Sequence, residues 1–272
     1  PGARMPAPVP LPAATPHRAP SYADWIAACE PSTEGLAAQR LIASCLNLRP
    51  KFSILVPLYR TPVAVLRDML ASVTAQTYEH WELCIAAGRA EDALNLAELE
   101  EWAARDPRLR IRALDCNEGI ALSSNAALEI ATGDYLVLLD HDDTLAPSAL
   151  FEFAKVINEE PGLAFLYSDK DQITADGTQR LAPLFKPAWS PELMWNANYL
   201  THLCAMRTQD VRAVGGWRRE TDGAQDWDLF LRVIRLGGAV RHVPHVLYHW
   251  RQLATSVAAG GLDAKPYAAD GQ

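Results

Sequence analysis

The feature that most constrains this fold is an alternation of two kinds of segment between residues 52 and 139. Short apolar runs predict buried strands, and apolar residues at helical spacing between them predict amphipathic helices. The predicted strands are 52–56, 81–85, 109–113 and 135–139. Three helices are predicted between them: one that begins at Pro62, one at 93–104 and one at 120–131. This order is typical of a mainly parallel sheet with helices on both faces.

Two local signals refine the first strand and helix. Pro57 is expected to end the strand, because proline cannot donate a hydrogen bond to a neighbouring strand. Thr61 is expected to cap the helix, with Pro62 in its first position. The apolar face of this helix consists of Val65, Leu66, Met69, Leu70 and Val73.

Beyond Asp143 the pattern is less regular, and no internal repeat is present. It predicts helices at 147–158, from Pro191 and at 226–236, strands at 163–167 and 240–248, and a turn at Asp176-Gly177. We interpret this half as an insertion-rich cap over the sheet of a single α/β domain.

The ends of the chain differ from its centre in composition. Residues 1–20 hold seven of the nineteen prolines and predict a flexible arm. Residues 21–49 predict a helical segment of two short helices broken at Pro31-Ser32 and packed on the main domain. The main domain is expected at 50–256. Residues 257–272 are expected to form a C-terminal tail, and a truncated sequence would explain its short length.

Charge and composition exclude several classes of protein. The chain has 25 basic and 33 acidic residues, a net charge of −8, and therefore no positive field for nucleic acid. Its apolar runs are far shorter than the roughly 20 residues that span a bilayer. Five cysteines without a CxxC pair suggest neither a disulfide framework nor a zinc site, so a cytoplasmic location fits best.

Three carboxylates directly follow the predicted strand 135–139, in the sequence Asp140-His141-Asp142-Asp143. Ligands of open parallel sheets bind beyond the carboxyl ends of strands. Clustered carboxylates repel one another, and Mg²⁺ or Mn²⁺ shared with a phosphate ligand would relieve that repulsion. A solvated turn with an aspartate cap for the next helix is the alternative.

Several blocks of sequence then occur together and in a fixed order: VPLYRTP, SVTAQTYEHWELCIA, NEGIALSSNAALEIATGDYLVLLDHDD, YSDKDQI, FKPAWSPELMWNANYLTHL, GAQDWDLFLRV and HVLYHWR. With them the chain resembles family 2 of the inverting glycosyltransferases from about Tyr22 to Ser256. More narrowly, it is similar to the enzymes that build bacterial surface polysaccharides such as rhamnose-containing O-antigens. The resemblance implies a GT-A fold, with a nucleotide-binding half followed by an acceptor-binding half.

The resemblance also implies roles for residues of the acidic cluster and of the first loop. Asp140 and Asp142 match the DxD motif, which contacts the nucleotide ribose and holds the metal on the donor diphosphate. Asp143 is also in reach, so the metal-binding carboxylate stays open. The loop that lines the base and ribose of the nucleotide is matched by Pro57, Leu58 and Tyr59.

Three further positions are implied in the second half. Asp226 matches the catalytic base, His249 matches a further metal ligand, and Arg251 is placed to face the diphosphate. From the residues alone, Asp226 could instead cap a helix, and His249 could be a hydrogen-bonded structural histidine. A sugar-stacking floor for the acceptor is a candidate role for Trp189, Trp195 and Tyr199, which core packing explains about equally well.

The chemistry of transfer agrees with these assignments. A sugar hydroxyl needs a carboxylate base to attack the anomeric carbon, and a cation stabilises the leaving diphosphate. Inversion needs one such base, whereas a retaining hydrolase needs a close pair of carboxylates.

The expected partners are a UDP- or dTDP-linked sugar, a glycan or lipid-linked glycan acceptor, and other domains of a larger glycan-building enzyme. Attachment at the inner face of the cell membrane stays open. A non-catalytic sugar- or nucleotide-binding module of a larger synthase is one alternative. A sugar nucleotidyltransferase is another, but the loop at 57–62 has no glycine to cradle a triphosphate.

One departure from the family concerns the nucleotide base. Relatives usually carry a carboxylate after the second strand that accepts the N3–H of uracil or thymine, whereas this chain reads Ala86-Ala87-Gly88. Glu91 and Asp92 follow in the same loop. Either one of them accepts the N3–H of the base instead, or both are carboxylates exposed to solvent. The hypothesis is a pyrimidine nucleotide held mainly through diphosphate, metal and ribose, with weak discrimination between bases.

Overall fold

The computed structural model of the chain describes residues 20–253. The predicted arm before Pro20 and the predicted tail 257–272 lie outside these residues. The chain divides into two compact units, residues 1–30 and 31–272. In the first unit, helix α1 (Tyr22–Cys29) follows a capping box in which the Ser21 hydroxyl accepts from the Asp24 N–H and the Asp24 carboxylate accepts from the Ser21 N–H.

The second unit begins with helix α2 (Thr33–Ser44), capped by Ser32. The two short helices predicted between residues 21 and 49 are therefore both present. Helix α2 contacts helix α6 (Ala149–Glu159). One link between them is a hydrogen bond of 3.3 Å from the Gln39 amide to Glu152.

Within the described part of the second unit, residues 31–253, a nine-stranded sheet has the order β3-β2-β1-β4-β8-β6-β9-β5, with β7 paired to β6. Its strands are β1 (Phe52–Leu58), β2 (Trp81–Gly88), β3 (Leu109–Leu114), β4 (Tyr135–Leu138), β5 (Thr144–Leu145), β6 (Phe165–Ile173), β7 (Arg180–Leu184), β8 (Cys204–Arg207) and β9 (Val240–Arg251). The strands β3, β2, β1 and β4 are parallel, as predicted, and β6 is parallel to β9. Strand β8 runs antiparallel to β4 and β6, and so joins the two halves of the sheet.

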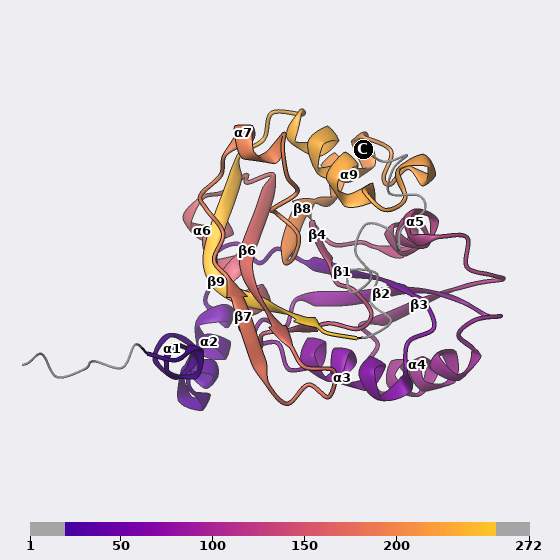
Figure 1. Cartoon of the computed structure of the whole chain (residues 1–272), viewed down its shortest axis with the longest axis horizontal. Helices are drawn as coiled ribbons and strands as arrows, with labels where there is room; N and C mark the ends of the chain where they lie inside the picture. The colour runs from indigo at the N-terminus through magenta and orange to yellow at the C-terminus, as the bar shows by residue number, and fades with distance from the viewer. Residues whose placement is uncertain (1–19, 254–272) are drawn as a thin grey trace, which may run out of the picture. The chain divides into compact units, whose positions relative to one another are not determined.

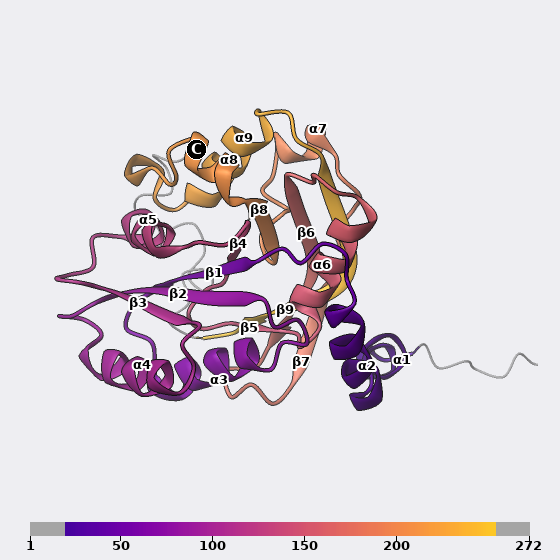
Figure 2. The same ribbon diagram turned by 180° about the vertical axis from the view of Figure 1, so that it is seen from behind.

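Helices cover both faces of this sheet (Figures 1 and 2). The other helices are α3 (Val63–Thr74), α4 (Ala93–Arg105), α5 (Ile120–Ile130), α7 (Pro191–Met194), α8 (Thr208–Ala213), η1 (Arg219–Thr221) and α9 (Gln225–Ile234). Helices α3, α4 and α6 share one apolar core, to which β1 contributes Ile54 and Val56. Helices α5, α8 and α9 share the other core, to which β1 contributes Leu55. The strand alternates between the two cores because successive side chains point to opposite faces.

The first strand is longer than predicted, because Pro57 does not end it. The Leu55 carbonyl accepts from the Leu139 N–H on the β4 side, where pairing ends at Leu138. Pro57, two residues further on, faces the same side, so its missing N–H costs no strand hydrogen bond. Pairing with β2 continues to Leu58.

The predicted cap of α3 was also wrong. The helix begins at Val63 after Pro62 and has no side-chain cap. The Thr61 hydroxyl instead lies 2.8 Å from Nδ1 of His141, in the acidic loop after β4. The predicted apolar face of α3 is confirmed, since all five of its residues are buried.

In the second half, β6 continues to Ile173 and β9 to Arg251, well past the predicted ends. Periodicity could not show this, because the extension of β6 includes Asp169 and Asp171. Both carboxylates are buried and pair with histidines of β9. The segments β5, β7, β8, α8 and η1 are too short to show a period and were not predicted. Within residues 20–253, no helix is long and apolar enough to cross a bilayer.

Candidate functional site

Strands β1 and β4 end side by side at the carboxyl edge of the parallel sheet, and a small pocket lies there. The pocket unites residues from β1, α5, the end of β4, the segment before β8 and the region around α9. Its lining residues are Leu55, Pro57, Ile120, Ser124, Leu138, Leu139, Asp140, His202, Trp217 and Asp226. Three residues predicted from separate motifs, Pro57, Asp140 and Asp226, therefore line one pocket.

Asp140 is the carboxylate of the acidic loop that faces this pocket. Its Oδ2 lies 3.3 Å from Nε2 of His202. Burial alone would raise the pKa of Asp140, but the charge and hydrogen bond of His202, together with His141 and Lys170, lower it to about 2. The His202 ring in turn stacks on Tyr248, with ring centroids 4.9 Å apart.

Asp143 faces the protein interior, and its side chain is fully buried. One of its oxygens accepts from the Tyr248 hydroxyl, and the other accepts from the Arg251 N–H at 2.7 Å. Burial and the neighbouring charges of Asp140 and Asp142 raise the pKa of Asp143 well above its usual value. This carboxylate therefore joins the acidic loop to β9.

Asp142 has the least compensation of the three carboxylates. Within the described part of the chain, its ion-pair partner is His141, at a long distance of 3.9 Å. Burial raises the pKa of Asp142, as does the charge of Asp140, while His141 and Arg251 act in the opposite direction. A bound cation would stabilise such a carboxylate in its ionised form.

Strand β9 carries the other two predicted residues of this region. Nδ1 of His249 lies 2.6 Å from Asp171, and His249 is opposite Thr144 in the β5–β9 pair. The Arg251 guanidinium is almost fully buried and donates to the carbonyl groups of Asp142 and Ala175 and to the Asp68 carboxylate, at 2.9–3.0 Å. Through these contacts the Arg251 side chain packs against the acidic loop.

Asp226 lies in the first turn of α9, whose N-cap is Ala224. The alternative that Asp226 caps this helix is therefore wrong. Its Oδ1 accepts from the Trp217 indole N–H at 3.1 Å, and both residues line the pocket. A neutral donor of this kind fixes the orientation of a carboxylate without neutralising its charge.

The predicted nucleotide loop has a different environment at each position. Pro57 lines the pocket, whereas the Leu58 side chain is buried in the core with α3 and α4. Tyr59 is exposed, and the Arg60 guanidinium lies 5.1 Å from its ring centroid. Leu58 can therefore contribute only its backbone to a ligand.

The two carboxylates of the loop after β2, Glu91 and Asp92, accept hydrogen bonds from the protein and are therefore not simply solvated. Asp92 is buried, and its Oδ1 accepts from the Arg60 N–H at 2.7 Å and from the Asn95 amide at 3.1 Å. Its Oδ2 and the neighbouring Oδ1 of Asn95 are buried and have no hydrogen-bond partner among residues 20–253. Two unsatisfied acceptors thus lie beside the loop that follows β1. Glu91 accepts from the Asn117 N–H at 3.2 Å.

The three predicted acceptor aromatics have different surroundings. Trp189 stacks on Tyr199 with centroids 6.5 Å apart, and Tyr199 packs edge-on against Tyr167. The Tyr199 hydroxyl also accepts from the Ser190 N–H at 2.9 Å. Trp195 is 66% exposed. Trp195 thus offers an open aromatic face, whereas Trp189 and Tyr199 support one another.

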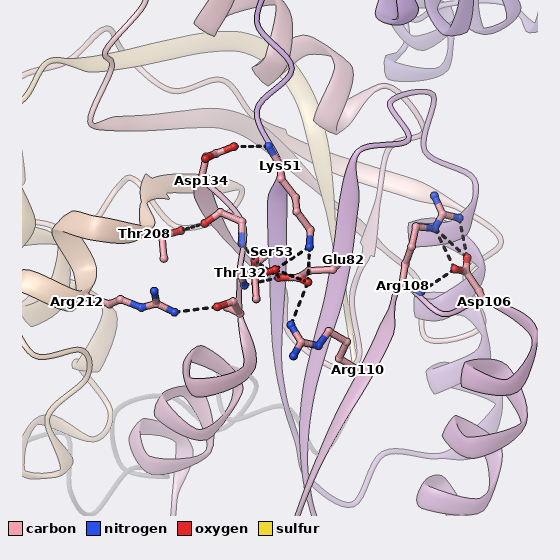
Figure 3. Close-up of polar contacts among 12 residues, drawn as sticks. Lys51, Ser53, Glu82, Asp106, Arg108, Arg110, Thr132, Asp134, Thr208 and Arg212 are labelled. Carbon is pink, nitrogen blue, oxygen red and sulfur yellow. Dashed lines mark hydrogen bonds and ion pairs between the residues drawn. The ribbon is translucent and has the colours of Figure 1, made fainter.

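A second polar cluster lies at the opposite, amino-terminal edge of the parallel strands (Figure 3). Buried Glu82 accepts hydrogen bonds from Lys51, Ser53 and Thr132 and pairs with Arg110. Burial would raise the pKa of Glu82, but these hydrogen bonds lower it to about 2. Because its carboxylate is saturated by protein donors, this cluster joins β1, β2 and the segment before β4 rather than binding a ligand.

Sequence analysis missed His202, Trp217 and Asp171. His202 and Asp171 lie within motif blocks of the family, but the resemblance implied no role for either residue. Trp217 lies outside all of these blocks. A histidine or tryptophan has no distinctive spacing, so only the fold could reveal these neighbours. No group of three or more His, Cys, Asp or Glu side chains within residues 20–253 is arranged to hold a metal ion by itself.

Comparison with known proteins adds independent evidence. A model of Glycosyl transferase family 2 matches residues 53–214. The O-antigen biosynthesis protein RfbC of Myxococcus xanthus is 38% identical over 254 residues, which cover 91% of this chain and 20% of that protein. The chain thus spans about a fifth of the length of this relative.

Two solved structures are similar in fold. S. aureus TarS 1–349 in complex with UDP-GlcNAc has a TM-score of 0.61 at 19% identity, over 75% of this chain and 59% of that chain. Mannosyltransferase PcManGT from Pyrobaculum calidifontis, in complex with GDP-Man and Mn²⁺, has a TM-score of 0.57 at 17% identity, over 83% and 68%. The predicted GT-A fold class is confirmed.

Proposed function

Because the chain belongs to glycosyl transferase family 2, we propose that it transfers a sugar from a nucleoside diphosphate donor to a hydroxyl of a growing bacterial surface glycan, with inversion at the anomeric carbon. The name of the RfbC relative supports the surface-glycan class. The nucleotide-sugar complexes of the two similar structures support the donor class.

The observation that carries this proposal is the common pocket of Asp140 and Asp226. These carboxylates come from segments 86 positions apart in the chain, and each has a polar partner beside the pocket, His202 and Trp217 respectively. Two carboxylates with separate partners can perform separate tasks, one toward the donor and one toward the acceptor.

In the proposed reaction, Asp226 accepts the proton of the acceptor hydroxyl while that oxygen attacks the anomeric carbon. The bond from the anomeric carbon to the diphosphate oxygen breaks, and its electron pair leaves with the nucleoside diphosphate. The Trp217 indole N–H donates a hydrogen bond to Asp226 Oδ1 and would keep the carboxylate oriented during the attack.

A divalent cation, Mn²⁺ or Mg²⁺, would be held by Asp142 and His249. The fit rests on the weakly compensated charge of Asp142 and on the contact of Nδ1 of His249 with Asp171. Two side chains are sufficient if the donor diphosphate supplies further oxygen ligands, which agrees with the absence of a three-residue group within residues 20–253. When bound, the cation would stabilise the negative charge of the departing diphosphate.

We assign Asp143 and Arg251 to support of the acidic loop. Both oxygens of Asp143 accept from β9, and Arg251 donates to the Asp142 carbonyl. The nucleotide would contact Pro57, the Leu58 backbone, Tyr59 and Asp140. Trp195 is the exposed candidate for acceptor stacking, and we assign Trp189 and Tyr199 to structural support.

The two alternative functions make different predictions. A non-catalytic binding module would bind a nucleotide sugar without consuming it. A sugar nucleotidyltransferase would consume a nucleoside triphosphate and release pyrophosphate. Transfer to a glycan acceptor, or slow hydrolysis of the donor with Mn²⁺, supports the glycosyltransferase and contradicts both.

Asp226→Asn tests the assignment of the base. We expect the variant to bind donor as the wild type does and to lose roughly 10²- to 10⁴-fold in turnover, because the base acts only as the hydroxyl attacks. The matched control is Asp228→Asn, in the same helical turn, whose carboxylate pairs with Arg232. Near-normal turnover of Asp226→Asn, measured with donor affinity, would overturn this role.

A further inference from the structure

A carboxylate that the reaction itself does not use lies directly behind His249. Asp171 of β6 is opposite His249 of β9 in a parallel pair, and its side chain is fully buried. Its Oδ1 lies 2.6 Å from Nδ1 of His249, and its Oδ2 accepts from Nε of Arg180 at 2.5 Å. The three side chains form a chain of contacts from β7 through β6 to β9.

The charges in this chain of contacts fix the roles of the two imidazole nitrogens. Asp171 pairs with the guanidinium of Arg180, so its oxygens act as acceptors. Nδ1 of His249 must then donate, which in the neutral imidazole leaves the lone pair of the ring on Nε2. A histidine binds a metal through a nitrogen that carries a lone pair, and a carboxylate on its other nitrogen orients the ring and raises its basicity.

The backbone around Asp171 explains how a charged residue reaches this position. The β6–β9 register shifts between Ser168 and Lys170, and the β6–β7 register shifts between Lys170 and Gln172. Such irregularities redirect side chains next to functional sites. Beyond the shifts, the pairing of Asp171 with His249 is regular.

We propose that Asp171, supported by Arg180, is a positioning residue that holds His249 with Nε2 available to a divalent cation. This inference rests on the proposed metal-dependent function and adds to it a residue that controls metal affinity. It assigns Asp171 no contact with the donor or the acceptor.

The same strand offers a matched control. Asp169, two residues earlier, is also buried and also pairs with a β9 histidine, His242, at 2.7 Å. It accepts in addition from the Lys186 N–H at 2.8 Å. Asp169→Asn therefore removes an equivalent charge from an equivalent pair that has no role in the proposed metal site.

The test is a double-mutant cycle on Mn²⁺ affinity. Mn²⁺ is titrated into the full chain and followed by electron paramagnetic resonance, with whichever of UDP, dTDP or GDP binds best. We expect Asp171→Asn to weaken Mn²⁺ binding by about 10- to 100-fold and Asp169→Asn to leave it within about twofold. In a His249→Gln background, Asp171→Asn should have no further effect, because it acts through the histidine.

Each other outcome has a defined meaning. Equal losses with and without His249, or an unchanged affinity in Asp171→Asn, would overturn the positioning role while leaving the metal assignment in place. If the wild type takes up no Mn²⁺ with any of the three nucleotides, the metal assignment fails and this inference fails with it. Should Asp171→Asn not fold, Arg180→Gln, which keeps the carboxylate on His249, must still weaken Mn²⁺ binding measurably for the proposal to stand.

Discussion

Three carboxylates within four residues have different environments in this chain, and these environments separate their roles. Asp140 pairs with His202 at the pocket, Asp143 is buried against β9, and Asp142 has only a distant partner within residues 20–253. The sequence motif alone left the metal-binding carboxylate open. The partners, which come from distant segments, favour Asp142.

Substituting each carboxylate in turn should therefore give two different results. Asp142→Asn is expected to weaken donor and Mn²⁺ binding with little loss of stability, because the charge of Asp142 is only weakly compensated by its neighbours. Asp143→Asn is expected to lower the melting temperature, since the amide nitrogen that replaces one oxygen cannot accept a hydrogen bond, and a buried donor left unsatisfied costs about 1–3 kcal/mol. Excess chelator should reproduce the first effect in the wild type, and Mn²⁺ should reverse it. Full activity in chelator would contradict the metal assignment.

Asp92 changes the hypothesis on base recognition. Its Oδ2 has no hydrogen-bond partner within residues 20–253 and is buried, so it could accept the N3–H of uracil or thymine, or the N1–H of guanine, only after the loop that follows β2 opens. We expect nucleotide binding to open this loop, and UDP, dTDP and GDP then to compete within about tenfold of one another. Asp92→Asn should weaken them by about 5- to 100-fold, the equivalent of about 1–3 kcal/mol for one buried hydrogen bond. Competition assays with Glu91→Gln as control measure this. A hundredfold preference for one base that survives Asp92→Asn would contradict both expectations.

Placing an aspartate at position 87, where relatives carry a carboxylate, would not test this hypothesis. The Ala87 side chain is only 1% exposed and packs in the core with α3 and α4. Gly88 has no room either, because a Cβ there would clash with Glu91 Oε2 and lie 2.9 Å from the Asn117 N atom. A carboxylate of this loop that binds the base would therefore have to come from a later position.

At the scale of elements, opposite edges of the parallel strands carry opposite kinds of polar cluster. The amino-terminal cluster around Glu82 is saturated and joins neighbouring strands (Figure 3). The carboxyl-terminal cluster keeps partly compensated carboxylates at a pocket. The saturated cluster and the candidate site therefore lie at opposite ends of the same strands.

The Glu82 cluster should make stability depend on pH in the acid range. The pKa of Glu82 is lowered from 4.5 to about 2 in the folded chain, so its contribution is complete above about pH 4.5 and is lost as the pH falls toward 2. The contribution is on the order of 3 kcal/mol. Denaturant unfolding from pH 7 to pH 3 measures it, and Glu82→Gln should remove most of this pH dependence. If the free energy of unfolding changed with pH in the same way in the wild type and in Glu82→Gln, the stabilising role of ionised Glu82 would be contradicted.

At the scale of the whole molecule, the division after Glu30 leaves the sheet, both cores and the pocket in the second unit. Helix α1 of the first unit contains no buried residue. We expect a chain that begins at Pro31 to unfold cooperatively, with a melting temperature within a few degrees of that of the full chain and unchanged nucleotide binding. Calorimetry and nucleotide titration test this, and loss of cooperative unfolding would show that residues 1–30 are required for the fold.

Local pattern was sufficient for the elements of the first half, because strand and helix periods repeat over few residues. The buried face of α3 and the βα alternation of β1 to β4 were predicted in this way. Pairing after β4 was not, because β8 reverses the strand direction through contacts between distant segments. The acidic motif likewise marked one wall of the pocket at the carboxyl edge of the sheet, through Asp140. Which carboxylate is available depended on Tyr248, His202 and other partners up to 108 positions away, because burial and charge compensation arise only when the chain is folded.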